Sequence, residues 1–458
     1  MVKRIICFTM AAVLTAALFA GCGSSNSNTT AASSSSAKAP EETTAPAKEV
    51  TLTLWQPAAT KQQVETDIEN DFLAANPNIK FNIVEQADMS TSAIMSAIAA
   101  GNAPAIFDAG YPSVMSYILQ NAVLPIDEYI ANTPDFANFA KDQVDQFLVN
   151  GKHYAVPRDK YAMGFFYNKK LFKEAGITAP PTTWDEFYDV AKKLTNPAKQ
   201  QYGFGLDGTQ WASWHFENWV WGAGGDLTKQ NPDGTVTLTF TDPAVITAAN
   251  FYRKLKADKV IQQDANAQID PLDKDFAMGK SGMIFGGLQM GKINWLVGSG
   301  MKLEDIGVFP FPKGPSGKAY AQIGGDAHFI PVTKDKDVAD AAWKWIMFKF
   351  SRDSWDRTLK DRASKGSIGA EILPRTDLKV SDYGAPNPEL QAAMDASNAI
   401  GKPEYYAKGA VGAVADDAIA KWFADPTQDV VKVMKAAEDA ANAKEAADFN
   451  KAVLEAEK

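Results

Sequence analysis

The chain has 458 residues, which exceeds the size of one usual hydrophobic core and favours an organisation in two lobes. Its formal net charge is −9 and its basic residues do not cluster, which argues against nucleic acid as a partner. Beyond residue 20, no apolar run is long enough to span a membrane.

The amino terminus has the pattern of a secretory signal. Lys3 and Arg4 form a short positive end, and residues 5–20 carry no charge. This uncharged run is shorter than the roughly 20 residues that a membrane-spanning helix needs. We therefore expect the segment to direct export rather than to remain as a transmembrane anchor.

The stretch LFAGC, residues 18–22, resembles the bacterial lipobox, in which the cysteine becomes the first mature residue and carries lipid. The resemblance implies a lipoprotein signal peptide over residues 1–21. It also implies a membrane anchor at lipidated Cys22, on the outer face of the bacterial cytoplasmic membrane, where several acyl chains hold a protein stably. The alternative is an ordinary signal peptide with an incidental cysteine. Because Cys7 lies inside the signal, no disulfide is expected in the mature chain.

Residues 22–49 are mostly Ser, Thr, Ala, Asn, Pro and Glu. A segment this poor in apolar side chains cannot build a core. We therefore predict a flexible tether that holds a globular body, beginning near residue 50, away from the membrane.

The start of the body alternates between strand and helix patterns. Apolar and polar residues alternate in the strand segments, and Asn76-Pro77 and Gly101 end the two helical segments between them. This order indicates an α/β fold with a right-handed parallel sheet. The expected elements are strands at 50–55, 79–83 and 105–107 and helices at 61–75 and 90–100.

Two further helices have recognisable starts. Thr183 and Glu186 form a capping box, and Phe187 begins an apolar face that continues to Leu194. Asp337 is expected to begin a second helix, which runs through the aromatic stretch that ends at residue 350.

Ligands of open parallel sheets bind beyond the carboxyl ends of the strands. We therefore expect site residues in three short segments that lie there. These segments are Trp55-Gln56, residues 108–111 and residues 158–161.

Four tryptophans fall within eleven residues: Trp211, Trp214, Trp219 and Trp221. We assign Trp219 and Trp221 to packing, and we expect Trp211 and Trp214, near the amino end of a helix, to line a cleft. An aromatic wall beside a few polar groups suits a sugar, which has an apolar ring face and hydroxyls at its edge. Whether His215 and Glu217 touch ligand stays open at this point.

Residues 154–177 and 180–186 resemble the signature of extracellular solute-binding protein family 1, the sugar-capturing components of ABC importers. Further matches follow in family order at residues 279–287, 323–326 and 341–346, and at 372–375. The family includes maltose-binding proteins. The resemblance implies two α/β lobes with a ligand cleft between them, a hinge that the chain crosses more than once, and delivery of the sugar to a transmembrane permease.

The implied amino-terminal lobe comprises residues 50–158 and 326–352, and the carboxy-terminal lobe comprises residues 159–325 and 353–458. We expect a monomer that needs no cofactor. Carried over position by position, the resemblance gives eleven ligand-binding candidates. They are Trp55, Gln56, Asp108, Tyr111, Asp159, Tyr161, Trp211, Trp214, Gln289, Asp326 and Arg375.

The sequence departs from the maltose-binding pattern in two places. Tyr161 stands where an acidic residue is expected near the hinge, and Leu288-Gln289 replace a stacking tryptophan. Maltose itself is therefore in doubt as the ligand. Asp159 and Asp326 can still accept hydrogen bonds from sugar hydroxyls, with a helix cap or a hinge salt bridge as the structural alternative for each.

Other functions have weaker support in the sequence. Residues 286–292 match a phosphate loop until Ile293, which replaces the Ser or Thr that would bind magnesium. The three histidines have no metal-ligand spacing. A surface glycoside hydrolase would need a positioned pair of carboxylates, which nothing singles out, so we expect no enzyme. A binding protein for a polyamine, a metal chelate or glycerol phosphate remains the main alternative.

Overall fold

The first strands form where the alternation predicts them. In the computed structural model, which describes residues 48–56, 62–86, 89–209, 211–264, 268–366, 372–384 and 388–456, β1 (Val50–Gln56) pairs in parallel with β2 (Ile79–Glu85). Ile106 adds a parallel bridge to Leu54, so three segments run in parallel as expected. The features predicted for residues 1–47 lie outside the described residues.

The intervening helices begin and end through identifiable local contacts. The Ser90 hydroxyl caps α2 (Thr91–Ala100) by accepting a hydrogen bond from the Ala93 amide, and Gly101 ends it with φ 74°. These are the cap and the stop that the sequence predicts for this helix. The helix α1 (Gln63–Ala75) buries Ile68 and Phe72 against the sheet.

Two hydrophobic cores define the amino-terminal lobe. One combines β1, α1 and the helix α12, and the other combines β3, α3 and β14. The remaining elements of this lobe are β3 (Phe107–Gly110), α3 (Val114–Leu119), α4 (Asp127–Ala131), α5 (Lys141–Val144), β4 (Leu148–Val149), β5 (Lys152–His153), β6 (Val156–Pro157), β14 (Asp326–Phe329), α12 (Lys336–Lys349) and α13 (Arg352–Ser364), with short 3-10 turns at Tyr111–Ser113, Pro134–Asn138, Asp145–Phe147 and Val380–Tyr383.

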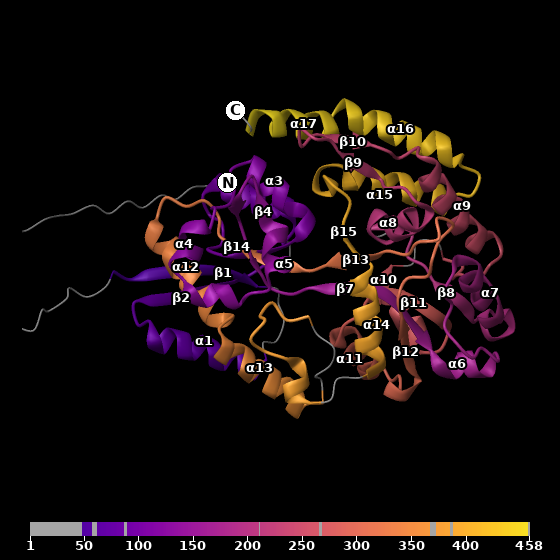
Figure 1. The fold of residues 1–458 in the computed structure, drawn as a ribbon, viewed down its shortest axis with the longest axis horizontal. Helices are drawn as coiled ribbons and strands as arrows, with labels where there is room; N and C mark the ends of the chain where they lie inside the picture. The colour runs from indigo at the N-terminus through magenta and orange to yellow at the C-terminus, as the bar shows by residue number, and fades with distance from the viewer. Residues whose placement is uncertain are drawn as a thin grey trace, which may run out of the picture. The chain divides into compact units, whose positions relative to one another are not determined.

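The carboxy-terminal lobe, whose strands and helices are labelled in Figure 1, is built on a six-stranded mixed sheet. Its central strand β7 (Tyr161–Asn168) is antiparallel to β11, β12 and β13, whereas β11 and β8 are parallel. The other elements are α6 (Lys169–Glu174), α7 (Trp184–Leu194), β8 (Tyr202–Gly205), α8 (Ala212–Ala223), β9 (Thr228–Gln230), β10 (Val236–Leu238), α9 (Pro243–Ala257), α10 (Ile269–Ala277), β11 (Ser281–Gly287), α11 (Met290–Gly298), β12 (Ile306–Phe309), β13 (Ala321–Gly324), α14 (Pro388–Ala399), β15 (Gly401–Pro403), α15 (Lys408–Ala424), α16 (Val430–Ala443) and α17 (Glu445–Ala456).

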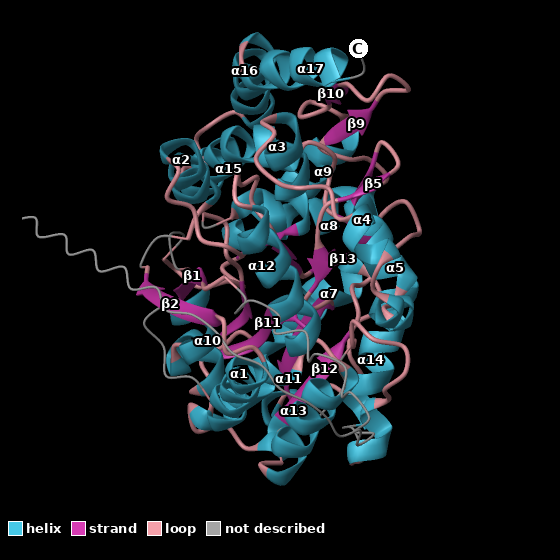
Figure 2. Cartoon of the chain, turned by 90° about the vertical axis from the view of Figure 1, so that its left-hand side faces the viewer, coloured by secondary structure: helices cyan, strands magenta, loops and turns pink. Residues whose placement is uncertain are grey.

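Each side of this sheet has its own core. Alternate residues of β7 point to opposite sides, so Phe165 packs with α7, α8 and α15, whereas Phe166 packs with α10, α11 and α14. Figure 2 shows α10, α11 and α14 around β11 and β12. The sheet of this lobe is mixed rather than parallel, because β7 runs antiparallel to β11, β12 and β13.

One predicted lobe boundary is also wrong. Residues 352–366 and 373–384 pack with the amino-terminal lobe rather than with the carboxy-terminal lobe. The helix α13 lies against α1 and α12, Trp355 joins their core, and the Leu373 carbonyl accepts a hydrogen bond from the Gln143 amide. An ion pair between Arg357 and Asp71, at 2.6 Å, fixes α13 to α1. The carboxy-terminal lobe resumes at α14.

The structure contains no helix within its described ranges that is both long and apolar enough to cross a membrane.

Candidate functional site

Two chain crossings between the lobes are joined at Arg158, directly after β6. Its guanidinium pairs with Asp108 of β3 at 2.6 Å, with Asp159 at 2.9 Å and with Asp326 of β14 at 2.6 Å. The Asp326 carbonyl accepts the Arg158 amide at 2.9 Å. Asp108 also pairs with His328. We call these five residues the hinge cluster. One arginine thus neutralises carboxylates from both strands that cross at this point.

The hinge cluster changes the protonation of its members. Burial would raise the pKa of Asp108, but its pairing with His328 and the charge of Arg158 outweigh burial and hold that pKa well below its usual range. Burial lowers the pKa of His328, which favours the neutral imidazole at pH 7. Burial raises the pKa of Asp326 despite its pairing with Arg158. Asp108 is therefore the firmly ionised partner of Arg158.

A glycine allows the strands to approach at the hinge. Gly325 has φ 150°, and a Cβ atom there would lie 2.8 Å from the Tyr111 hydroxyl and would clash with the Asp159 carbonyl. That hydroxyl donates a hydrogen bond to the same carbonyl at 2.9 Å. Tyr161 packs against Gly324 and Gly287 in the same way. These contacts leave no room for a side chain at Gly324 or Gly325 and make the Cβ position at Gly287 tight.

A cavity of about 700 Å³ lies beside the hinge cluster and is lined by both lobes. This volume falls within the roughly 300–1,000 Å³ of typical small-molecule sites. The amino-terminal lobe contributes aromatic rings, among them Trp55, Trp345 and Trp355, and the carboxy-terminal lobe contributes Gln289 and Asn294. The cavity thus combines ring faces with amides, which is the composition expected of a sugar site.

The eleven predicted site residues divide into several places. Five of them line the large cavity: Trp55, Gln56, Asp108, Asp159 and Gln289. Asp326 does not line this cavity and is paired with Arg158. Tyr111 instead lines a second cavity of about 430 Å³. The ligand contacts proposed for these residues stay predictions.

The tryptophan-rich segment forms α8 and its start. Trp219 and Trp221 are buried, which confirms the packing role assigned to them. Trp211 is 57 % exposed with φ 50°, and its ring lies 6.4 Å from that of Trp214 in an edge-to-face arrangement. Neither ring lines the large cavity. The aromatic wall proposed for Trp211 and Trp214 therefore stays a prediction.

Glu217, left open by the sequence, is fully buried and accepts the Tyr405 amide at 3.1 Å. His215 packs edge to face with Trp214, at a centroid distance of 4.8 Å. Both side chains support α8 and its surroundings, and neither lines the large cavity.

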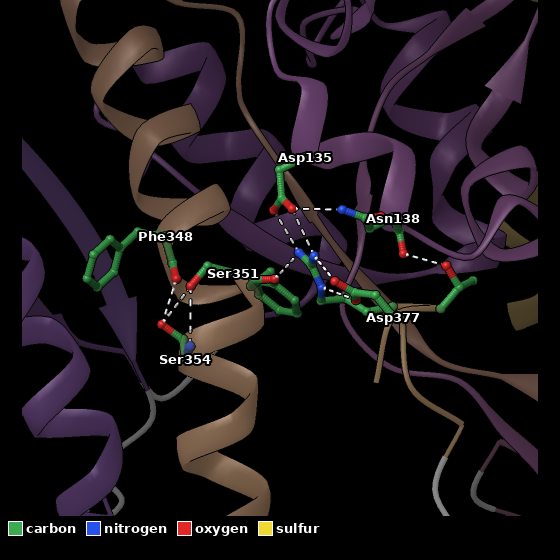
Figure 3. A network of polar contacts seen from close by, with 9 residues as sticks. Asp135, Asn138, Phe348, Ser351, Ser354 and Asp377 are labelled. Atoms are coloured by element: carbon green, nitrogen blue, oxygen red, sulfur yellow. Dashed lines mark hydrogen bonds and ion pairs between the residues drawn. The ribbon is translucent and has the colours of Figure 1, made fainter. Parts of the chain in front are cut away.

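The structure argues against the ligand contact predicted for Arg375. Its side chain has no exposed surface and makes bidentate pairs with Asp135, at 2.7 and 2.9 Å, and with Asp377, at 2.8 Å. It also donates to the Phe350 carbonyl at 3.0 Å. Figure 3 shows Asp135 and Asp377 in this network, together with Asn138. Arg375 therefore ties residues 372–384 to the amino-terminal lobe.

Sequence reasoning missed two members of the hinge cluster. Arg158 belongs to residues 158–161, where we expected site residues, but only Asp159 and Tyr161 of this segment were predicted to contact ligand. His328 was considered for metal binding, yet its partner is Asp108, which faces it across the β3–β14 pair. The alternation of β14 places Asp326 and His328 on one face, and this pattern could have indicated the cluster. Within the described ranges, no three His, Cys, Asp or Glu side chains are placed to hold a metal ion.

The sequence profile of the family Bacterial extracellular solute-binding protein matches residues 49–353. The chain belongs to this family of binding proteins. A Brucella abortus binding protein is 27 % identical over 316 residues, which cover 68 % of this chain and 74 % of the relative. The diacetylchitobiose-binding protein of Streptomyces coelicolor is 26 % identical over 238 residues, or 52 % of this chain and 54 % of the relative.

Solved structures share the two-lobe fold. A substrate-binding protein of a Listeria monocytogenes ABC transporter, in complex with cycloalternan, has a TM-score of 0.72 at 19 % identity, covering 86 % of this chain and 99 % of the other. Maltose-bound MalE3 of T. maritima has the same TM-score, identity and coverage. At this identity the likeness establishes the fold alone.

Proposed function

We propose that the protein captures a neutral sugar or oligosaccharide in the large cavity between its lobes and delivers it to the permease of an ABC importer. The observation that carries this proposal is the cavity itself, which joins Trp55 and Gln56 of one lobe to Gln289 of the other. Ring stacking on indole faces and hydrogen bonds to amides are complementary to a pyranose. The names of relatives that bind diacetylchitobiose or maltotriose support the same ligand class.

The charges around the cavity favour a neutral solute. Its lining contains equal numbers of carboxylates and basic side chains, namely Glu65, Glu69, Asp108 and Asp159 and Arg158, Lys160, Lys349 and Arg362. Several are already paired, as Lys160 is with Asp142 at 2.7 Å. A site for a polyamine would require more carboxylates than basic groups. A site for glycerol phosphate would require more basic groups than carboxylates. The balance therefore argues against both alternatives.

The proposal includes a lipid anchor at Cys22, a monomeric protein on the outer face of the cytoplasmic membrane, and no catalysis. The lipobox-like stretch supports the anchor. Asp108 and Asp159, the carboxylates at the hinge side of the cavity, are both bonded to Arg158, which opposes the acid and nucleophile roles that a glycoside hydrolase requires.

Calorimetric titration of the purified protein with glucose, maltose, maltotriose, lactose and diacetylchitobiose tests the proposal. Truncating a buried aromatic anchor costs roughly 2 kcal/mol or more, so Trp55→Ala should weaken binding at least tenfold. Trp295→Ala provides the matched control, because this indole is 38 % exposed and does not line the cavity. Unchanged affinity in a folded Trp55→Ala protein would exclude the large cavity as the sugar site.

A further inference from the structure

A second cavity, of about 430 Å³, shares no lining residue with the first. The amino-terminal lobe lines it with Tyr111, Met115 and Leu119 and with the turn after β4. The carboxy-terminal lobe lines it with Gln230 and with residues 403–408, between β15 and α15, and with the end of α17. Both lobes therefore contribute walls to this cavity as well.

The wall from the carboxy-terminal lobe contains an unusual set of buried ions. Lys408 pairs with Glu404, and its ammonium lies 3.5 Å from Glu217 Oε1. The side chains of Lys408, Glu404 and Glu217 are 13 %, 10 % and 0 % exposed. Apart from these ion pairs, neither Lys408 Nζ nor Glu217 Oε1 has a hydrogen bond within the described ranges. We call these three residues the buried triad.

The buried triad is costly to maintain. Removing charges from water costs several kcal/mol per ion, and well-packed apolar side chains of similar volume would often be as stable. Burial raises the pKa of Glu217 well above its usual range, which favours the neutral carboxyl, and Glu404 is the closer partner of the Lys408 ammonium. Buried ionisable groups of this kind cluster at functional sites. The large cavity uses none of the three.

The buried triad also fixes an aromatic wall. Glu217 Oε2 accepts the Tyr405 amide at 3.1 Å, and the Tyr405 hydroxyl bonds to Ser213 at 3.0 Å. The Tyr406 hydroxyl donates to the Gly234 carbonyl at 2.6 Å. Glu217 therefore holds the segment that presents Glu404, Lys408 and two tyrosine rings to the cavity.

We propose that this second cavity binds a small neutral molecule with neighbouring hydroxyl groups, such as a mono- or disaccharide, beside the pair of Lys408 and Glu404. Lys408 holds the Glu404 carboxylate in the cavity wall, and the lone pairs that the ammonium leaves free accept hydrogen bonds from adjacent hydroxyls. The proposal takes its ligand class from the proposed function, but it rests on different residues. A ligand bound there contacts both lobes near the point where α15 lies against α3. The lobes approach closely at this point, since a Cβ atom at Gly409 would be only 2.8 Å from the Pro112 carbonyl oxygen.

The test is calorimetric titration of the full protein with glucose, maltose, maltotriose, lactose and diacetylchitobiose. The double variant Glu404→Gln/Lys408→Met keeps the volume of the pair and removes its charges. The matched control, Lys435→Met/Asp439→Asn, removes an exposed pair with the same four-residue spacing on α16. We expect two binding events in the wild type and in the control. The double variant should weaken one of these events at least tenfold, and Trp55→Ala should weaken the other at least tenfold.

Each outcome separates the two proposals. If the wild type shows a single binding event that Trp55→Ala weakens, and the folded double variant binds as tightly as the wild type, the second site is overturned. The proposed function then stays intact. If the wild type shows a single binding event that the double variant weakens and Trp55→Ala does not, the second cavity is supported as a sugar site. The large cavity is then excluded as the sugar site. No binding of any of the five sugars overturns both. If the double variant melts early, Gln230→Trp narrows the cavity from an exposed rim position and should weaken the same event.

Discussion

Arg158 and Asp326 join the two strands that carry the chain between the lobes. The guanidinium of Arg158 lies 2.6 Å from the Asp326 carboxylate, and the Arg158 amide donates to the Asp326 carbonyl at 2.9 Å. Asp108 binds the same guanidinium from the amino-terminal sheet. The hinge is therefore an ionic junction as well as a backbone one, and its strength should depend on pH.

The pH dependence follows from Asp108, whose folded-state pKa is lowered. A lowered carboxyl pKa stabilises the fold at pH values above the unfolded-state pKa, and this stabilisation is lost as the pH falls through the folded-state pKa. We expect Asp108→Asn to reduce the free energy of unfolding at pH 7 and to differ less from wild type below about pH 4. Urea unfolding of both proteins between pH 3 and pH 7 measures this difference, and a difference that grows on acidification would contradict it.

Arg375 should matter for stability and not for binding. Arg375→Ala leaves Asp135 and Asp377 without their cation, and because these carboxylates are 43 % and 25 % exposed, we expect a loss of about 2–3 kcal/mol. Arg375→Lys retains the charge but not the two bidentate pairs, so it should lose less. Chemical denaturation gives the stability, and titration with sugar gives the affinity. A tenfold loss of affinity without a loss of stability would restore Arg375 to the site.

Gly325 should not tolerate a side chain. Gly325→Ala would force a Cβ atom against the Asp159 carbonyl and the Tyr111 hydroxyl, so we expect a loss of more than about 1 kcal/mol in the free energy of unfolding. Gly298→Ala, at the end of α11, is the matched control because nothing lies within 4 Å of its Cβ position. Thermal melting compares the two, and equal melting temperatures would show that the hinge can relax.

The lipid anchor is tested by Cys22→Ala. We expect the variant to fold and bind sugar like the wild type but to leave the membrane fraction, because lipid on Cys22 is the proposed attachment. Cell fractionation followed by immunodetection measures the distribution, with Ser24→Ala in the adjoining segment as the control. Equal membrane retention of both variants would rule out lipidation at Cys22.

Local features of the fold could be predicted from the sequence because they depend on neighbouring residues. Ser90 and Gly101 bound α2 as expected, and Trp219 and Trp221 are buried as expected. The helix expected from Asp337 begins instead at Lys336, with Asp335 as its cap. One-residue differences of this kind arise because neighbouring aspartates can cap equally well.

Features that depend on distant partners could not be predicted. Arg375 meets Asp135 across 240 positions of sequence, and no local pattern distinguishes a buried ion pair from a ligand contact. The helix α13 meets α1 across 286 positions of the chain, through the Arg357–Asp71 pair, so the lobe boundary near residue 352 also depends on a distant contact. Glu404 and Lys408 are four residues apart, which resembles an ordinary surface pair until Glu217 is found beneath them.

The return of α15 to the carboxy-terminal lobe constrains how the chain can fold. Tyr405 and Trp422 complete a core with α8, whose residues precede them by about 200 positions. The amino-terminal lobe likewise needs β14 and α12 from the second half of the chain. A chain that emerges with its amino terminus first therefore cannot close either core early, and the sheet around β7 stays incomplete until β15 has emerged. Carboxy-terminal truncations should expose the α8 core.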